Sequence, residues 1–282
     1  MVRRCSKIRS DSLLSRSTAV EVYDRYVTGE KTLTTSGTRI LKIEIFLVLG
    51  LSLGQSAVYS LISFADKATR APLREQTTSM NNPLNTREYF DLAYQLLDIL
   101  FALLPVALAL YFMHRTLGRS IRDIGFDFRR PGKDALLGVC LFLVMGIGTL
   151  GVYAAGRAFG ITTALATANL ADYWWSVPVL VLSAVRHAVL EEVVMLAFLF
   201  GYGKRLNLGP WVLILGSALL RGSYHLYQGA GPMIGNFAMG VVFGWIYHKY
   251  GRVMPLVIAH FLLDAVGFVG FLLIGPAIGI GA

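Results

Sequence analysis

Long apolar runs constrain the fold of this chain more than any other feature of its sequence. A helix that crosses a bilayer needs about 20 consecutive apolar residues, and runs close to that length recur along the chain. They lie at residues 43–64, 91–113, 134–156, 174–203, 209–228, 232–248 and 253–275. Backbone N–H and C=O groups within lipid find partners only in helices or closed barrels. The runs therefore predict an all-α, polytopic membrane protein with about seven transmembrane helices (about six to eight).

Composition agrees with this class. Hydrophobic residues make up 55% of the 282 residues and charged residues only 15%, which excludes an ordinary soluble domain. No apolar core precedes residue 43, so we expect no cleavable signal peptide. Cys5 and Cys140 offer neither a disulfide framework nor a Cys-ligated metal site.

The distribution of basic residues predicts the orientation. Residues 1–42 carry nine Lys and Arg against four Asp and Glu, and the loop at 114–133 adds six basic residues. Loops on the cytoplasmic side carry such an excess. We therefore expect a multi-pass plasma-membrane protein with a cytoplasmic N-terminus, and the segments 65–90 and 157–173 outside. The net charge of +9 then requires no nucleic-acid partner, and the expected partners are membrane lipid and a membrane-embedded protein or peptide.

Ionisable side chains inside the runs concentrate in the last third of the chain. Each costs roughly 2.5 to 3.5 kcal/mol at the bilayer centre, so a cluster of them predicts a functional site. The polar residues of the last four runs are Arg186, His187, Glu191, Glu192, Arg221, His225, Asn236, His260 and Asp264.

The spacing of these residues predicts which of them face one another. Residues four apart share a helix face, and this spacing joins His187 to Glu191, Arg221 to His225 and His260 to Asp264. Neighbouring residues lie about 100° apart on a helix, so Glu191 and Glu192 are not expected to point at the same atom. We expect one carboxylate to perform chemistry while the other holds a partner such as Arg221.

Several functions fit such a cluster. A carboxylate and a histidine can deprotonate a water and direct it at a carbonyl, and a second histidine can stabilise the oxyanion. The same groups can instead form a polar network that fixes helix packing. A proton-coupled transporter would also bury them, but the first half of the chain holds no second copy of the pattern, as an internal repeat would require. No cofactor is required, although Glu191, His225 and His260 would suit zinc.

Four segments resemble the motifs of a known protease family, the CAAX prenyl endopeptidase and bacteriocin-processing (CPBP) intramembrane proteases. "EEVVM", "SALLRGSYHLYQG" and "GNFAMGVVFGWIYHKYGRVMPLVIAHFLLD" resemble its three motifs, and "IRDIGFDFRRPGKDALLGV" resembles the start of its shared region. The resemblance covers about residues 119–270. Together with the charge and the apolar runs, it predicts four parts: a basic tail at 1–42, two helices with an external loop at 43–118, a protease core at 119–275 and a short tail at 276–282.

The resemblance also implies an activity, the hydrolysis of a peptide bond in a membrane-associated protein or peptide. Glu191 and His225 would activate the water, and His260 with Asp264 would form the oxyanion side. Glu192 would complete the catalytic set. The supporting residues would be Arg221, His187 and Asn236.

One position departs from the family pattern. The family has Arg four residues after the second Glu, where this chain has Leu196. We expect Arg221, from the neighbouring run, to replace that Arg as the partner of Glu192. A noncatalytic membrane scaffold, or an immunity or maturation factor on the same fold, is the alternative function.

Overall fold

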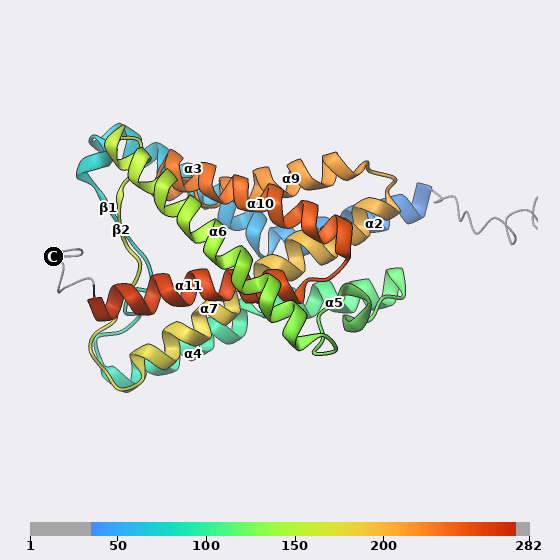
Figure 1. The fold of residues 1–282 in the computed structure, drawn as a ribbon, viewed down its shortest axis with the longest axis horizontal. Helices are drawn as coiled ribbons and strands as arrows, with labels where there is room; N and C mark the ends of the chain where they lie inside the picture. Colours follow the sequence, from blue (N-terminus) through green and yellow to red (C-terminus); the bar gives the residue numbers. More distant parts are fainter. Residues whose placement is uncertain (1–34, 275–282) are drawn as a thin grey trace, which may run out of the picture. The chain divides into compact units, whose positions relative to one another are not determined.

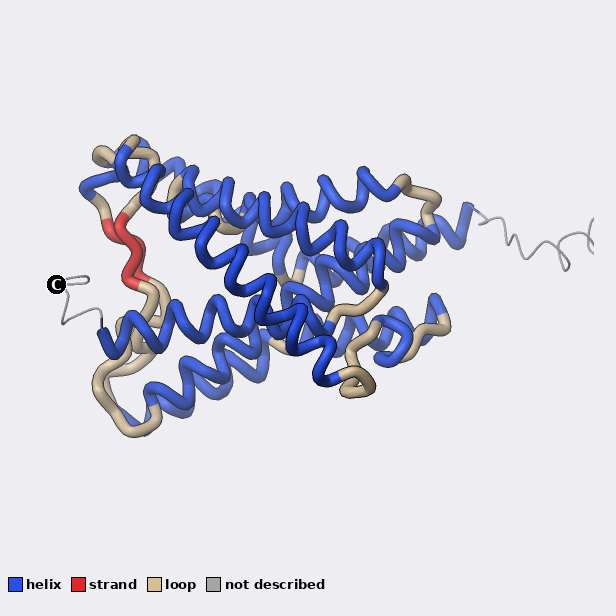
Figure 2. Tube along the Cα trace, in the orientation of Figure 1, coloured by secondary structure: helices blue, strands red, loops and turns tan. Residues whose placement is uncertain are grey.

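The computed structural model describes residues 35–274, and these residues are almost entirely helical (Figures 1 and 2). The predicted all-α class is confirmed. The described residues from Lys42 onward belong to one compact unit. The predicted C-terminal tail and most of the basic tail lie outside the described residues. The helices are α2 (Thr35–Gly50), α3 (Leu53–Arg70), α4 (Glu88–Ala102), α5 (Leu104–Leu117), α6 (Pro131–Ala158), α7 (Ser176–Glu192), α8 (Leu199–Arg205), α9 (Pro210–Ser223), α10 (Ala230–Tyr250) and α11 (Met254–Ile274).

Fewer helices meet the length and hydropathy of a membrane span than the sequence predicts. Among the described residues, three do so: Glu88–Leu117, Pro131–Ala158 and Met254–Leu273, with the bent pair α2 and α3 as a fourth. The predicted number of seven is therefore not confirmed. One reason is length, because α9 has only 14 residues. Another is charge, because α7 and α8 carry acids and bases along one continuous helical stretch.

The first predicted run, 43–64, is not one straight helix. It bends by 52° between α2 and α3. At the bend the Ser52 hydroxyl donates to the Val48 carbonyl oxygen at 2.5 Å. A side chain at Gly54 would place its Cβ 2.7 Å from the Leu49 carbonyl oxygen, so the close approach of the two helices requires glycine there.

Close packing brings α7, α9 and α11 around one interior. The helix α11 packs against α7 and α6, and α10 packs against α9 and α6. Glycines allow these approaches: a Cβ at Gly240 would lie 2.7 Å from the Ala218 Cα, and one at Gly138 would lie 2.6 Å from the Ile258 side chain. Small residues serve this purpose between membrane helices.

A short parallel ladder joins two loops that the sequence predicts on the same side. The strands β1 (Thr77–Ser79) and β2 (Ala164–Ala166) pair in parallel. The Met80 N–H donates to the Ala166 carbonyl at 2.8 Å, and the Ala164 N–H donates to the Gln76 carbonyl at 2.9 Å. In Figure 1 the strands run side by side between the ends of α3 and α6 and the starts of α4 and α7. The predicted grouping of these loops therefore agrees with the structure.

An ion-pair cluster lies at the 114–133 loop, which the sequence predicts on the opposite side of the membrane from the strands. Arg252, between α10 and α11, lies 3.0 Å from Asp127 and 2.6 Å from Asp134. The hydrogen bond from Arg252 holds the pKa of Asp127 below its usual range. These contacts connect the 114–133 loop to the α10–α11 loop. Which group of loops faces the cytoplasm stays a prediction.

Candidate active site

Glu191 and Glu192 end α7 and are followed directly by a π-helix, η3 (Val193–Phe198). Single-turn π segments inside helices are frequent at functional sites. Both glutamates are buried, with exposed fractions of 5% and 0%. All six residues of the π-helix are buried as well, and they include Leu196. The pair of acids is therefore carried into the protein interior on a helix of altered pitch.

Glu192 is held by two cationic or polar side chains from two other helices. The Arg221 Nη2 of α9 donates to its Oε1 at 2.7 Å. The His260 Nδ1 of α11 lies 2.7 Å from the same oxygen. A carboxylate accepts hydrogen bonds, so Nδ1 is the donor. The predicted pairing of Arg221 with Glu192 is confirmed.

Glu191 contacts the same arginine and the same histidine as Glu192, and it also contacts a tyrosine. The Tyr224 hydroxyl donates to its Oε2 at 2.6 Å. The same oxygen lies 3.3 Å from the Arg221 Nη1 and 4.0 Å from the His260 Nε2. The two glutamates thus approach different atoms of the same guanidinium and the same imidazole. The sequence identifies neither this shared geometry nor the role of Tyr224, although its place beside His225 offered a signal.

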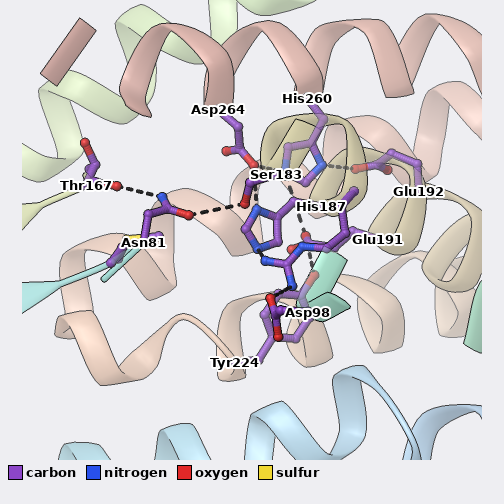
Figure 3. A network of polar contacts seen from close by, with 12 residues as sticks. Asn81, Asp98, Thr167, Ser183, His187, Glu191, Glu192, Tyr224, His260 and Asp264 are labelled. Carbon is purple, nitrogen blue, oxygen red and sulfur yellow. Dashed lines mark hydrogen bonds and ion pairs between the residues drawn. The ribbon is translucent and has the colours of Figure 1, made fainter. Parts of the chain in front are cut away.

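The predicted pair on α11 forms, and it extends to α7. The His260 Nε2 lies 3.6 Å from the Asp264 Oδ2, and the His187 Nδ1 lies 3.6 Å from that same oxygen. Figure 3 shows His187, Asp264, His260 and Glu192 in succession. No described contact joins His187 to Glu191, its predicted partner on the same face. His187 instead faces across to α11.

A further contact extends the cluster to α4. The Arg186 Nη1 donates to the Asp98 Oδ2 at 3.1 Å, and its Nη2 lies 2.6 Å from the His187 Nε2. Since a guanidinium can only donate, the His187 Nε2 accepts, and the neutral ring carries its proton on Nδ1 toward Asp264. Asp98 therefore orients His187 through Arg186.

His225 corrects one prediction. The helix α9 ends at Ser223, so Arg221 and His225 do not share a helix face. The His225 N–H donates to the Gly222 carbonyl at 3.1 Å, a tighter turn than an α-helix, and η4 (Leu226–Gln228) follows. Neither ring nitrogen has a hydrogen-bond partner among the described residues. The charges of Glu191, Arg221 and His260 all act on this ring.

Asn236 lies apart from these contacts. Its side-chain Nδ2 donates to the Pro232 carbonyl of its own helix at 3.0 Å. No described hydrogen bond or ion pair links it to the glutamates or histidines. The predicted supporting role of Asn236 therefore has no direct contact behind it.

The site does not have the donor set of a metal centre. Among residues 35–274, no group of three or more His, Cys, Asp or Glu side chains is arranged to hold a metal ion. The guanidinium of Arg221 lies within 3.3 Å of Glu191 and 2.7 Å of Glu192, and its positive charge opposes a second cation there. This charge disfavours zinc at Glu191, His225 and His260, and zinc ligation by these residues stays an untested alternative.

Comparison with family models places this cluster in a known class. Residues 173–266 match the model described as "type II CAAX prenyl endopeptidase Rce1-like". This segment is an Rce1-like domain. The match confirms the resemblance seen in the sequence, over a shorter range than the expected 119–270.

The Rce1-like domain contains every predicted site residue from Arg186 to Asp264, whereas Asp98 lies outside it. Comparison with the curated proteins and with the solved structures found no match. The match of this segment and the apolar helices together indicate a membrane protein.

Proposed function

We propose that the chain is an intramembrane endopeptidase that cleaves a membrane-associated protein or peptide with a water activated by Glu191 and His225. One observation supports this most strongly. Two fully or nearly buried carboxylates on α7 meet a guanidinium and a phenol from the α9 end and an imidazole from α11. Such groups carry a large insertion cost, and a proteolytic task accounts for their convergence.

The contacts divide the work between the two acids. Glu192 binds Arg221 and His260 at 2.7 Å each, so its role is to hold those side chains. Glu191 receives its described contacts on Oε2, which leaves Oε1 for a water proton. Both ring nitrogens of His225 lack partners among the described residues, so one of them is free to accept a hydrogen bond from the water in the proposed mechanism. The geometry thus favours Glu191 as the base.

The proposed reaction is amide hydrolysis by direct attack of water, without a covalent enzyme intermediate. Glu191 takes a proton from the water while the oxygen attacks the carbonyl carbon. The resulting oxyanion accepts a hydrogen bond from His260, whose ring Glu192 orients and beside which Asp264 lies. The C–N bond breaks as the proton held by Glu191 passes to the leaving nitrogen. The oxyanion re-forms the carbonyl group, and water and peptide yield a carboxylic acid and an amine, which become a carboxylate and an ammonium once the second water proton passes between them.

Glu191→Gln tests this proposal, because it keeps the side-chain volume and removes the base. Membranes that hold the wild-type chain or the variant are compared by profiling newly formed protein termini, which requires no known substrate. We expect the termini produced by the wild type to disappear while detergent stability stays nearly unchanged. Glu44→Gln is the matched control, since Glu44 is also buried, lies outside the Rce1-like domain, and is bound by Thr116 and Tyr202 but by none of the candidate site residues in the described structure.

A noncatalytic scaffold is the second candidate, because Leu196 occupies the position of the family's Arg. Arg221 supplies a guanidinium to Glu192 despite this change, which favours the enzyme. A scaffold predicts that Glu191→Gln lowers stability and leaves the termini unchanged, and that result would overturn the enzyme proposal. Stoichiometric zinc in the purified chain, with cleavage lost to a chelator and restored by zinc, would replace the base mechanism with a metal one.

A further inference from the structure

The turn that carries His225 is held by α3, a helix far away in the sequence. The Tyr227 N–H donates to the Ser60 hydroxyl at 2.8 Å, and the Lys67 Nζ donates to the Tyr227 carbonyl at 2.8 Å. Both backbone polar groups of one residue in the turn are therefore bound by side chains of α3. The Lys67 ammonium also lies 5.6 Å from the centre of the Tyr227 ring.

A second set of contacts ties Lys67 to the loop after α6. The Lys67 Nζ donates to the Thr78 hydroxyl at 2.6 Å, and the hydroxyls of Thr78 and Thr163 lie 2.7 Å apart. Thr163 then donates to the Gln228 carbonyl through its N–H at 3.1 Å and its hydroxyl at 3.0 Å. The carbonyls of Tyr227 and Gln228 are thus fixed from two directions, with Lys67 at the junction.

His225 depends on such backbone contacts. It stands beyond the end of α9, and its ring nitrogens bind no described residue. Its position follows from the turn, in which the Gln228 N–H donates to the His225 carbonyl at 3.1 Å. A displacement of about 1 Å in a reacting group can cost about 100-fold in rate. The residues that fix the conformation of this turn therefore also fix the position of the His225 ring in the reaction.

We propose that Lys67, assisted by Ser60, is a positioning residue for His225. It acts through the Tyr227 carbonyl and touches neither the water nor the substrate. This inference rests on the proposed function, and it adds that the Rce1-like domain at 173–266 receives part of its active-site geometry from a helix outside the matched segment.

Lys67→Met tests the inference, because it keeps the length of the side chain and removes its donors. Amide hydrogen exchange is measured by mass spectrometry on the full chain in lipid nanodiscs. We expect peptides covering residues 224–230 to exchange about tenfold faster, with no change in peptides from α11. Arg70→Met is the matched control on the same helix, since Arg70 is exposed and pairs with Asp66. Unchanged exchange at 224–230 would overturn the inference.

The second readout is the rate at which new termini appear in membranes. Lys67→Met should slow it about tenfold or more, Lys67→Arg should restore part of it, and Arg70→Met should leave it unchanged. Faster exchange with an unchanged cleavage rate would overturn the positioning role. Should Lys67→Met fail to fold, Ser60→Ala replaces it, since it removes the acceptor of the Tyr227 N–H. Hydrogen exchange needs no substrate, so it tests the positioning role of Lys67 independently of cleavage. The enzyme proposal is tested separately by Glu191→Gln.

Discussion

Arg221→Leu should be among the most destabilising single changes in this chain. The side chain of Arg221 is 1% exposed, and its guanidinium lies 2.7 Å from a Glu192 oxygen that is itself fully buried and 3.3 Å from Glu191. Removing Arg221 leaves two buried carboxylates without their shared cation. Loss of one partner from a buried ion pair costs about 3 to 5 kcal/mol, because the other charge stays uncompensated.

Other contacts set the expected size within that range. Glu192 keeps His260 at 2.7 Å, and Glu191 keeps the Tyr224 hydroxyl at 2.6 Å. We therefore expect a loss of about 3 kcal/mol in the free energy of unfolding, at the low end of the range. Glu192→Gln in the same chain should recover part of this loss, with a coupling energy of about 1 to 3 kcal/mol.

The measurement is a double-mutant cycle on reversible unfolding in mixed lipid–detergent micelles, with wild type, both single variants and the double variant. The exposed pair of Arg70 and Asp66, with side-chain exposures of 68% and 56%, is the internal control. Its cycle of Arg70→Leu and Asp66→Asn should couple by only about 0.2 to 1 kcal/mol. Additivity of Arg221→Leu and Glu192→Gln within about 0.5 kcal/mol would refute the buried pair.

Three further outcomes are expected. Cysteine placed at Thr77, an exposed strand position, should react with an impermeant reagent outside the cell, and cysteine at Arg122 should not; the reverse pattern would invert the topology. Gly229→Ala should lower the free energy of unfolding by about 1 to 3 kcal/mol, because φ is +109° and the new Cβ would lie 2.6 Å from a backbone oxygen; no loss would contradict this turn. Arg252→Gln should lower the free energy of unfolding near pH 7 and progressively less below about pH 4. Arg252 lowers the pKa of Asp127 in the folded state, and the stabilisation that this gives disappears once Asp127 is protonated in both the folded and the unfolded state. A loss of unfolding free energy that stays constant with pH would argue against this pairing.

The polar cluster was predictable because its members stand out against hydrocarbon. Glu191, Glu192 and His260 are ionisable residues within apolar runs, and only a shared interior satisfies such groups. The partner of Glu192 followed from the same reasoning, since Arg221 lies within the neighbouring apolar run and can replace the Arg that the family has at the position of Leu196. Residue chemistry and spacing were sufficient for these contacts, because each partner lies on a helix that hydropathy identifies.

The end of α9 was not predictable in this way. The apolar run predicted from the sequence extends to residue 228, so the sequence predicts a helix that continues past Ser223. Distant hydrogen bonds decide otherwise: Thr163 and Lys67 bind carbonyls of the turn that a longer helix would use internally. Because α9 ends at Ser223, His225 does not lie one helical turn beyond Arg221, where the sequence predicts it. The same ending places the Tyr224 hydroxyl beside Glu191.

The ladder of β1 and β2 is built from backbone groups, and this affects how the chain tolerates change. Substitutions at the exposed residues Thr77 and Ser79 leave its main-chain bonds intact. A single-residue insertion between Ser79 and Asn81 does not, because Asn81 accepts from the Ser183 hydroxyl at 3.2 Å and donates to the Thr167 carbonyl at 2.7 Å. We therefore expect this segment to tolerate a change of residue at Thr77 or Ser79 better than a change of length.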